Sequence, residues 1–487
     1  MRKIALFTLA FCAYYFCLAQ EPDWYFTFGA PNSYSSIFDL QIDENGNIYA
    51  LAMIFPETDV DPGPDELILA ASNYSSRALL KYRSDGSLIW GKSLGNFNGK
   101  LRINHKGEII LGGVFSKEIQ FGDQTFNPIG GYDHFLAKLS SSGEFIWAIS
   151  MGSEQDESLF DLEVDSEGNI LMYGDYMGEM DVDPGEETHQ INNQGYRDVL
   201  LASYSTDGKF NWECHFGSSQ NEFPTSLTLD QQGDIHITGT FLSSFKVQTP
   251  VGEKNVKKLG WSNMYWACID QSGQVQWIKS LGGAGYIGGG FLEEAQDGSF
   301  WLLTGINNEV DIAFGDTQKI IKSTTEDVSD MVLAHYDAEQ NLLATRQFKS
   351  KSYAEIADFH LTADGRMYIS GNFRANLGID WDSNMPQMTA DTLWDGFVVG
   401  IMPEDQSVFW SKHLTGPQGE GLNVVREDQE GNIYLGGSYM DNSRFDPRGI
   451  NLELSSKGIY EAILMRFPAV IPQGKKRTKR PKRTKKQ

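Results

Sequence analysis

Hydrophobic positions along the chain recur in short runs separated by turns, and one nine-residue phrase returns several times. The phrase consists of a hydrophobic strand, a tight turn with Asp-Gly or Ser-Gly, and a second strand that ends in tryptophan. Its clearest copies span residues 82–90, 139–147, 204–212 and 269–277, and their tryptophans lie 57, 65 and 65 residues apart. A copy without tryptophan, from Tyr336 to about Arg346, and a copy that ends at Trp410 continue the series. A fixed period of this length predicts an array of identical supersecondary units.

A second hairpin, of the form Asp-x-x-Gly-x-hydrophobic or a close variant, keeps step with the first. Its glycines are Gly46, Gly107, Gly168, Gly233, Gly298, Gly365 and Gly431, at intervals of 61 to 67 residues. Glycine takes positive φ without a steric clash, and a preceding Asp or Asn can hydrogen-bond the backbone of its own turn. Seven such hairpins predict seven modules.

Each module reads as four strands, because its runs are rich in aromatic and β-branched residues and bounded by Gly, Asp or Ser. In the third module we expect strands over 159–165, 169–174, 198–205 and 209–216. Four antiparallel strands repeated seven times predict an all-β fold, a seven-bladed β-propeller over residues 20–468. The last module lacks its tryptophan strand, which residues 24–29 (WYFTFG) resemble. We therefore expect the N-terminal strand to complete the last blade and close the ring.

The modules resemble a known family, the bacterial β-propeller repeat proteins often called SBBP. The family pattern is matched by DQEGNIYLG at 428–436, DHFLAKL at 133–139 and GEFIWAISMG at 143–152. The resemblance covers nearly all of the chain after its first twenty residues. It is weakest in the fifth module, where Gln340 replaces the turn glycine and no tryptophan follows. It implies a propeller fold and a secreted location, and it implies no catalytic residues.

Residues 1–19 predict a secretory signal peptide, since Arg2 and Lys3 precede an apolar run that is short for a membrane span. No later segment is apolar enough to cross a bilayer, so we expect a secreted or periplasmic protein, monomeric in solution. After signal removal only Cys214 and Cys268 remain. They can pair between neighbouring modules or stay as two buried thiols, and without a C-x-x-C motif zinc is not expected.

Charge divides the chain into an acidic body and a basic tail, residues 469–487. Nine Lys or Arg lie within 475–487, which leaves 31 basic against 65 acidic residues elsewhere, a net charge near −34. We expect self-repulsion to keep the tail disordered, as an interaction arm. Behind a signal peptide, an anionic surface polymer or the protein's own acidic body is the expected partner rather than nucleic acid, and simple solvation is the alternative.

The strand order sorts the loops onto two faces. The turns within strand pairs one-two and three-four are short and define the hairpin face. The connections from second to third strand are about twenty residues long, as at 177–197, and share the opposite, long-loop face with the links between blades. Because long loops on a rigid scaffold commonly carry binding, we expect this face to bind an extracellular protein or glycan.

Two sets of acids on the long-loop face are candidate ligands. The phrase D-V-D-P-G places Asp59 and Asp61 in one module and Asp181 and Asp183 two modules later, with weaker copies at 380–382 and 445–447. Paired carboxylates suit calcium, and the alternative is a Pro-Gly turn with solvated acids. The second set precedes the first strand of several blades and consists of Glu157, Glu222, Glu355 and Glu420. They can form an acidic ring that binds a cation, or accept hydrogen bonds from a neighbouring blade.

The repeated tryptophans stand at one fixed strand position, which favours packing between blades over sugar stacking. The chain contains no G-x-S-x-G, phosphate-binding loop or H-E-x-x-H motif. We therefore expect a binding or scaffold module. The alternative is a propeller hydrolase or lyase that acts on extracellular glycans, and acids and a base converging in the channel would favour it.

Overall fold

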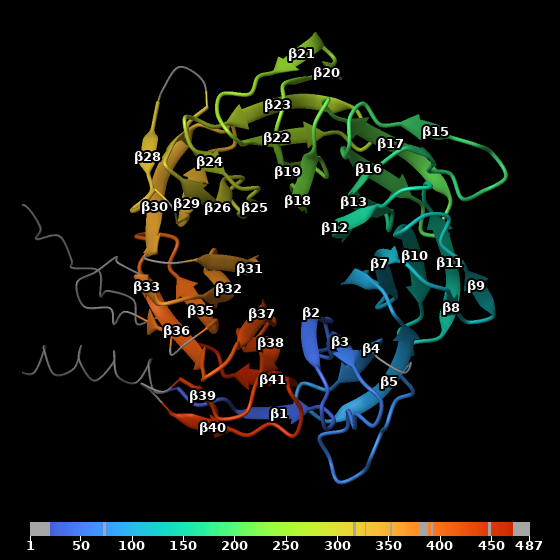
Figure 1. Ribbon diagram of the computed structural model, residues 1–487, viewed down its shortest axis with the longest axis vertical. Coiled ribbons are helices and arrows are strands. Elements are labelled where there is room, and N and C mark those ends of the chain that lie inside the picture. The colour runs from blue at the N-terminus through green and yellow to red at the C-terminus, as the bar shows by residue number, and fades with distance from the viewer. Residues whose placement is uncertain are drawn as a thin grey trace, which may run out of the picture.

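The computed structural model describes residues 20–71, 75–314, 318–326, 328–350, 353–378, 388–390, 393–446 and 450–470. All regular secondary structure of these residues is β, arranged as seven blades around a central channel (Figure 1). None of them forms a helix with the length and hydrophobicity that spanning a bilayer requires. The expected signal peptide, nearly all of the basic tail and the D-W-D phrase at 380–382 lie outside the described residues.

Each blade is an antiparallel sheet whose four principal strands follow one another from the channel outward. Blade 1 contains β2 (Ser36–Ile42), β3 (Ile48–Ile54), β4 (Ser76–Tyr82) and β5 (Leu88–Gly95). Blade 2 contains β6 (Asn98–Ile103), β7 (Ile109–Phe115), β10 (Asp133–Leu139) and β11 (Phe145–Met151). Blade 3 contains β12 (Ser158–Val164), β13 (Ile170–Tyr176), β16 (Asp198–Tyr204) and β17 (Phe210–Phe216). Blade 4 contains β18 (Glu222–Leu229), β19 (Ile235–Phe241), β22 (Asn263–Ile269) and β23 (Val275–Leu281).

The last three blades depart slightly from this plan. Blade 5 contains β25 (Phe291–Glu294), β26 (Phe300–Asn307), β29 (Asp330–Tyr336) and β30 (Leu342–Ser350), and β24 (Tyr286–Ile287) also pairs with β26. Blade 6 contains β31 (Ala354–Leu361), β32 (Met367–Phe373), β35 (Asp395–Ile401) and β36 (Val408–Thr415). Blade 7 contains β37 (Gly421–Glu427), β38 (Ile433–Tyr439), β41 (Glu461–Phe467) and, from the other end of the chain, β1 (Trp24–Phe28).

The long connections contain short hairpin arms, which the sequence pattern did not predict. These arms are β8 (Ile119–Phe121) with β9 (Gln124–Phe126), β14 (Glu179–Asp181) with β15 (Gln190–Asn192), β20 (Phe245–Thr249) with β21 (Gly252–Val256), β27 (Glu309–Asp311) with β28 (Ile320–Lys322), β33 (Asn376–Gly378) with β34 (Met388–Thr389), and β39 (Ser443–Phe445) with β40 (Leu452–Leu454). In blade 1 a single bridge between Asp59 and Ile68 takes the place of an arm.

The structure confirms the seven-bladed propeller and its closure by the N-terminal strand. β1 pairs with β41 from Trp24 opposite Arg466 to Phe28 opposite Ala462. The Arg466 guanidinium also lies 2.5 Å from the Asp23 carboxylate. All seven glycines of the first hairpin have φ between 73° and 89°, which explains why glycine recurs there.

The apolar core is divided into seven clusters, one at each junction between neighbouring blades. The repeated tryptophans stabilise four of these junctions by docking on the three-four turn of the next blade. A Cβ at Gly86, Gly143, Gly208 or Gly273 would lie 2.5 to 3.1 Å from the indole of Trp24, Trp90, Trp147 or Trp212. The indole N–H groups of Trp24, Trp147 and Trp212 donate to carbonyls in the same turns. These contacts explain why each phrase combines a turn glycine with a tryptophan.

Candidate functional site

The innermost strand of every blade presents one side chain to the channel at a fixed place, five residues before the hairpin glycine. Around the ring these residues are Gln41, Arg102, Glu163, Thr228, Glu293, His360 and Arg426. Register supports the equivalence, since each pairs with the corresponding residue of the second strand. Five of these seven residues are ionisable, so a belt of ionisable groups crosses the middle of the channel.

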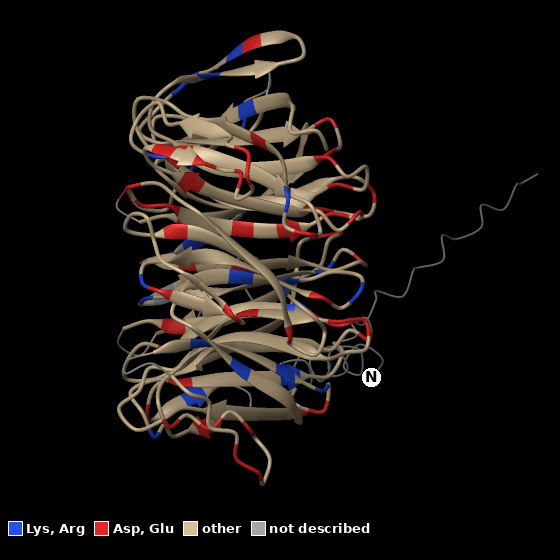
Figure 2. Ribbon diagram, turned by 90° about the vertical axis from the view of Figure 1, so that its right-hand side faces the viewer, with Lys and Arg blue, Asp and Glu red and all other residues tan. Residues whose placement is uncertain are grey.

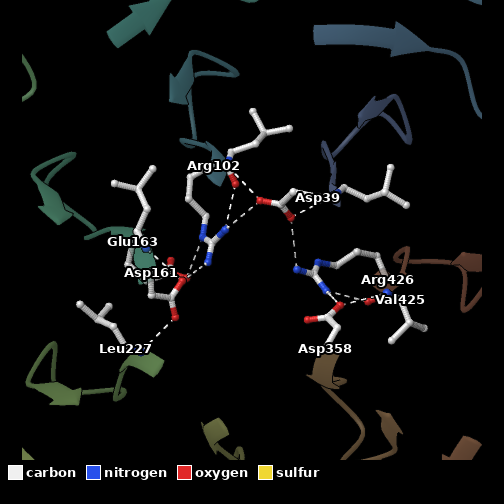
Figure 3. Close-up of polar contacts among 11 residues, drawn as sticks. Asp39, Arg102, Asp161, Glu163, Leu227, Asp358, Val425 and Arg426 are labelled. Atoms are coloured by element: carbon white, nitrogen blue, oxygen red, sulfur yellow. Dashed lines mark hydrogen bonds and ion pairs between the residues drawn. The ribbon is translucent and has the colours of Figure 1, made fainter. Parts of the chain in front are cut away.

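Arg102 joins blades 1, 2 and 3 through carboxylates on both sides (Figure 3). Its Nε donates to Glu163 at 2.8 Å and its Nη2 donates to Asp161 at 2.8 Å. Its Nη1 lies 3.6 Å from the Asp39 carboxylate. Burial opposes the charge of Arg102, but the three carboxylates more than offset it and hold its pKa above the ordinary value.

Arg426 repeats this arrangement on the other side of Asp39. Its Nη1 donates to Asp358, and its Nη2 lies 3.6 Å from Asp39 (Figure 3). Asp39 is 3% exposed and lies between the two guanidinium groups. The two arginines therefore connect carboxylates of blades 1, 3 and 6 through a single network.

The bulges in β2, β12 and β31 place their aspartates to hold the next blade. A register shift lies beside each of Asp39, Asp161 and Asp358. Each carboxylate accepts the backbone N–H of the following blade, from Leu101, Leu227 and Val425, at 2.9, 3.0 and 2.9 Å. These aspartates therefore fix the spacing of neighbouring inner strands. β-bulges commonly re-aim side chains at functional positions, and here they aim carboxylates into the channel.

Two further ionisable groups face the same network. Burial and the nearby Glu163 raise the pKa of Glu293 to about 8, so this carboxyl is mostly protonated at neutral pH. Burial and the positive charge of Arg426 lower the pKa of His360 to about 3, so this imidazole is neutral. Within the described part of the chain, neither side chain has a hydrogen-bond partner. The channel therefore contains acids and a neutral base beside fixed charges.

Sequence reasoning missed this belt, although a signal for it exists. In the first, third and sixth modules an aspartate stands seven residues before the hairpin glycine. These residues are Asp39, Asp161 and Asp358, and a hydrophobic residue follows each of them. In the second and seventh modules an arginine, Arg102 or Arg426, stands five residues before the hairpin glycine. An alignment of the modules by their glycines would have placed the three aspartates at one position and the two arginines two positions later. Residues two apart on a strand share one side, so all five would have been expected close together.

The D-V-D-P-G phrases form a shared turn at the base of the second-to-third connections. Asp181 Oδ1 accepts the N–H groups of Asp183 and His189 at 3.1 and 2.9 Å, and Asp183 Oδ1 accepts that of Gly185 at 2.8 Å. In blade 1, Asp59 and Asp61 accept the N–H groups of Asp61, Leu67 and Gly63 in the same pattern.

The valine between the aspartates explains the rest of the phrase. Val182 is fully buried, and its carbonyl accepts the hydroxyl of Tyr204 at 2.9 Å. Val60 and Tyr82 form the same 2.9 Å bond in blade 1. The described residues contain no group of three or more His, Cys, Asp or Glu arranged to hold a metal ion. The recurrence thus has a structural account, and the calcium role stays a prediction.

The four glutamates expected near the channel mouth lie in different surroundings. Glu157 accepts the hydroxyl and N–H of Ser153, and Glu222 accepts the same two groups of Ser218. Both are buried, Glu157 just before β12 and Glu222 at the start of β18, and burial raises the pKa of each to about 7. Glu420 is also buried and accepts the Ser443 hydroxyl at 2.8 Å. Glu355 is exposed on β31, and a ligand role for these glutamates stays a prediction.

Exposed aromatic side chains are distributed around the long-loop face, where the second-to-third connections meet the links between blades and the innermost strands begin. They are Tyr34, Phe38, Tyr132, Tyr196, Phe223, Trp261, Tyr286 and Tyr353. Trp261 is 82% exposed and Tyr196 is 63% exposed. Bridges between Tyr132 and Asp156 and between Ser262 and Tyr286 fix two of these meeting points. Tyr and Trp side chains are enriched at protein interfaces.

Cys214 and Cys268 are both free and buried. Burial raises the pKa of each thiol to about 12, so neither is a reactive thiolate at neutral pH. The structure therefore supports the alternative of two buried thiols rather than a disulfide.

No family model matches the chain. It is 26% identical over 286 residues to the regulatory protein FlaEY of Caulobacter vibrioides, covering 50% of this chain and 29% of that protein. It is 19% identical over 294 residues to an uncharacterised WD repeat-containing protein of Acanthamoeba polyphaga mimivirus, covering 53% of this chain and 20% of that protein. The chain thus spans less than a third of the length of these relatives.

Solved structures with a similar arrangement have low sequence identity. A protein of unknown function from Dyadobacter fermentans matches 93% of this chain and 100% of its own, at 10% identity and a TM-score of 0.38. The endosialidase of phage phi92 matches 94% of this chain and 71% of its own, at 10% identity and a TM-score of 0.38. An ulvan lyase matches 87% of this chain and 83% of its own, at 10% identity and a TM-score of 0.35.

Proposed function

We propose that this propeller is a secreted or periplasmic binding module whose long-loop face takes an extracellular protein. The observation that carries the proposal is the set of eight exposed aromatic residues on that face. Tyr and Trp supply large contact areas at low entropic cost and are enriched at protein interfaces. Buried charges in the channel brace the inner strands, so the loops are presented on a rigid frame.

A protein partner fits this distribution better than a single sugar chain does. The aromatic residues are spread around the ring over the first six blades, from Tyr34 before blade 1 to Tyr353 before blade 6. A partner that contacts them together must cover most of the face. Small-ligand sites are instead concave and concentrated. Two hollows of this kind lie away from the aromatic residues, on the hairpin side and at the outer edge of blades 4 and 5.

The test is to identify the partner from an extracellular protein fraction, purify it and measure its affinity for matched variants. We expect Trp261→Ala with Tyr196→Ala to weaken binding by about 2 kcal/mol or more, as aromatic hot spots do. Tyr25→Ala with Leu343→Ala removes two exposed apolar residues from outer strands and should leave affinity unchanged. Equal losses in both double variants, or capture of polysaccharide alone, would reject a protein-binding face.

A glycan hydrolase or lyase is the second candidate, because acids and a neutral base do converge in the channel. The protonated Glu293 beside the paired carboxylates Asp161 and Glu163 has the acid and base character that glycan cleavage needs. Arg102 and Arg426, however, engage these carboxylates in ion pairs, which suits a bracing role. The candidate requires that wild-type protein release reducing or unsaturated ends from an acidic polysaccharide and that Glu293→Gln abolish this release. No release by the wild type across a polysaccharide panel would reject it.

A further inference from the structure

The junction between blades 4 and 5 lacks the tryptophan docking that stabilises four of the other junctions. Trp277 occupies the docking position of blade 4, but the facing turn of blade 5 has Gln340 in place of glycine, with φ of 63°. The Trp277 ring instead packs inward against Trp266 and His236, at 5.6 and 5.7 Å between ring centroids. This junction, termed the open junction, therefore lacks the indole-on-glycine contact of those four junctions.

A groove of about 570 Å³ occupies the outer side of this open junction. Its walls include Lys254 and Lys257 from the arm β20–β21, Lys279 from β23, and Phe314 from the long connection of blade 5. None of the described residues that line it is acidic. In a protein of net charge −25 this is a local reversal of sign.

The lysines are placed to receive an anion. Lys279 donates to Gln340 Oε1 at 2.8 Å and to the Glu339 carbonyl at 3.3 Å, and its ammonium lies 5.4 Å from the Phe314 ring centroid. These partners are uncharged, so they orient the ammonium without neutralising it. Burial and the neighbouring Lys254 lower the pKa of Lys279, while Asp337 opposes the shift. A bound anion would relieve the repulsion between the lysines.

The arm that supplies two of the lysines is also unusual. β20 and β21 have five residues each, whereas the strands of the other arms have two or three. The arm stands out from the ring at the top of Figure 1 and of Figure 2, where most other coloured loops are acidic. Its sequence from 245 to 258 contains four lysines and one glutamate. Blade 4 thus extends a basic arm beside the open junction.

We propose that this groove binds an anionic sugar unit, carboxylated or sulfated, of an extracellular polysaccharide. The lysines contact its acidic group, and the amides of Asn255 and Asn341 lie on the same walls to hydrogen-bond its hydroxyls. Phe314 supplies an apolar surface for a face of the sugar ring. None of the eight exposed aromatic residues of the long-loop face lines this groove, so its fate does not depend on the protein partner proposed there.

Site-resolved lysine labelling of the full-length protein tests the proposal without interference from the basic tail. The probes are a galacturonate tetramer, a heparin tetrasaccharide, a neutral dextran oligosaccharide and inorganic sulfate. We expect at least one acidic oligosaccharide to protect Lys254, Lys257 and Lys279 from acetylation, while Lys246 and Lys258 stay reactive. Protection by inorganic sulfate to the same extent would overturn the sugar assignment, and equal protection of all five lysines would overturn the groove.

A charge-matched pair of variants supplies the affinity test. Lys254→Gln with Lys257→Gln should weaken binding of the protecting probe about tenfold, because two of the three lysines that contact its acidic group lose their charge. Lys246→Gln with Lys258→Gln makes the same charge change on the same arm, outside the groove lining, and should leave affinity nearly unchanged. Both pairs replace exposed residues, so folding is retained. Equal weakening by both pairs, or no binding of any acidic probe by the wild type, would reject the site.

Discussion

Arg102 holds carboxylates from the blades on either side of its own, Asp39 from blade 1 and Asp161 and Glu163 from blade 3. Its side chain is only 14% exposed, so the charges are largely removed from water. Burying charges costs free energy, and the loss of one partner leaves the others uncompensated. The network is therefore more sensitive to losing Arg102 than to losing a single surface ion pair.

Replacing Arg102 with methionine tests this dependence. We expect Arg102→Met to lower the free energy of unfolding at pH 7 by about 3 kcal/mol, because three carboxylates lose their shared partner. Denaturant unfolding followed by tryptophan fluorescence measures the change. Lys100→Met is the matched control, since Lys100 stands two residues earlier on β6 and the described residues include no ion-pair partner for it. A comparable loss in both variants would show that channel charge in general, rather than the network, sets stability.

Gly208 shows why the three-four turn of a blade needs glycine for two reasons. Its φ is 76°, and a Cβ there would lie 3.1 Å from the Trp147 indole of the preceding blade. Alanine would therefore strain the turn and displace the docked ring.

We expect Gly208→Ala to lower the free energy of unfolding by about 2 kcal/mol, with about half from backbone strain and half from the lost ring contact. Gly46→Ala is the matched control, since Gly46 has φ of 75° and its added Cβ would meet only Ser84 Cβ, at an ordinary 3.6 Å. The difference between the two variants in thermal or denaturant unfolding isolates the contact with tryptophan. If Gly46→Ala costs as much as Gly208→Ala, docking contributes nothing measurable.

At the scale of the strand, β1 is the only principal strand that joins its blade from a distant part of the sequence within the described residues. It covers the edge of β41, which would otherwise present unpaired N–H and C=O groups. Trp24 on this strand also docks on Gly86 of blade 1, so β1 connects the two ends of the ring.

Deletion of residues 20–29 should therefore lower the melting temperature and cause concentration-dependent association. We expect the association to occur through the exposed edge of β41, which can pair with a strand of a second chain. Differential scanning calorimetry and light scattering measure the two effects. Trp24→Ala keeps the strand pairing and removes the docked ring, so it should lower the melting temperature without association. A monomeric deletion variant with unchanged melting would contradict non-covalent closure.

The turn at Asp181 links the arm of blade 3 to its core. Substitutions of Asp181 can distinguish a purely structural turn from a cation-binding site. Asp181→Asn keeps an acceptor oxygen for the N–H groups of Asp183 and His189, whereas Asp181→Leu removes it. In chelator we expect Asp181→Asn to melt close to wild type and Asp181→Leu to lose about 1 kcal/mol. A calcium-dependent rise in melting temperature in wild type alone would add the predicted cation role.

At the scale of the molecule, the sequence predicted the parts of the fold that repeat. Blade number, strand order and closure follow from glycines and tryptophans at fixed spacing, and the strands predicted for the third module end within one or two residues of those observed. The channel belt was not predicted, because its members come from different modules and no two adjacent modules share the same residue. The groove at blade 5 follows from a departure, Gln340, that the sequence does show. The effect of Gln340 on the junction could not be predicted from the sequence, because the sequence does not show which tryptophan faces that turn.

The stability of the whole molecule should depend on pH through carboxyls that the fold keeps protonated. Burial raises the pKa of Glu157 and Glu222 to about 7 and that of Glu293 to about 8. In the unfolded chain these groups release their protons near pH 4.3. Between that value and their folded pKa the folded protein binds more protons, so stability falls as pH rises. Burial lowers the pKa of His134 to about 4 and that of His360 to about 3, which opposes this trend only below about pH 6.5.

We therefore expect the free energy of unfolding to fall by on the order of 2 kcal/mol between pH 6.5 and 8.5, after allowing for solvent in the channel. Denaturant unfolding at constant ionic strength measures the slope. Glu293→Gln keeps a neutral side chain at every pH, so it should flatten the upper part of the curve, between about pH 7 and 8.5. Glu187→Gln, on an exposed loop, changes net charge equally and should leave the slope intact. A slope that both variants flatten alike would mean that repulsion among the many surface acids, and not the channel carboxyl, makes the propeller less stable in alkali.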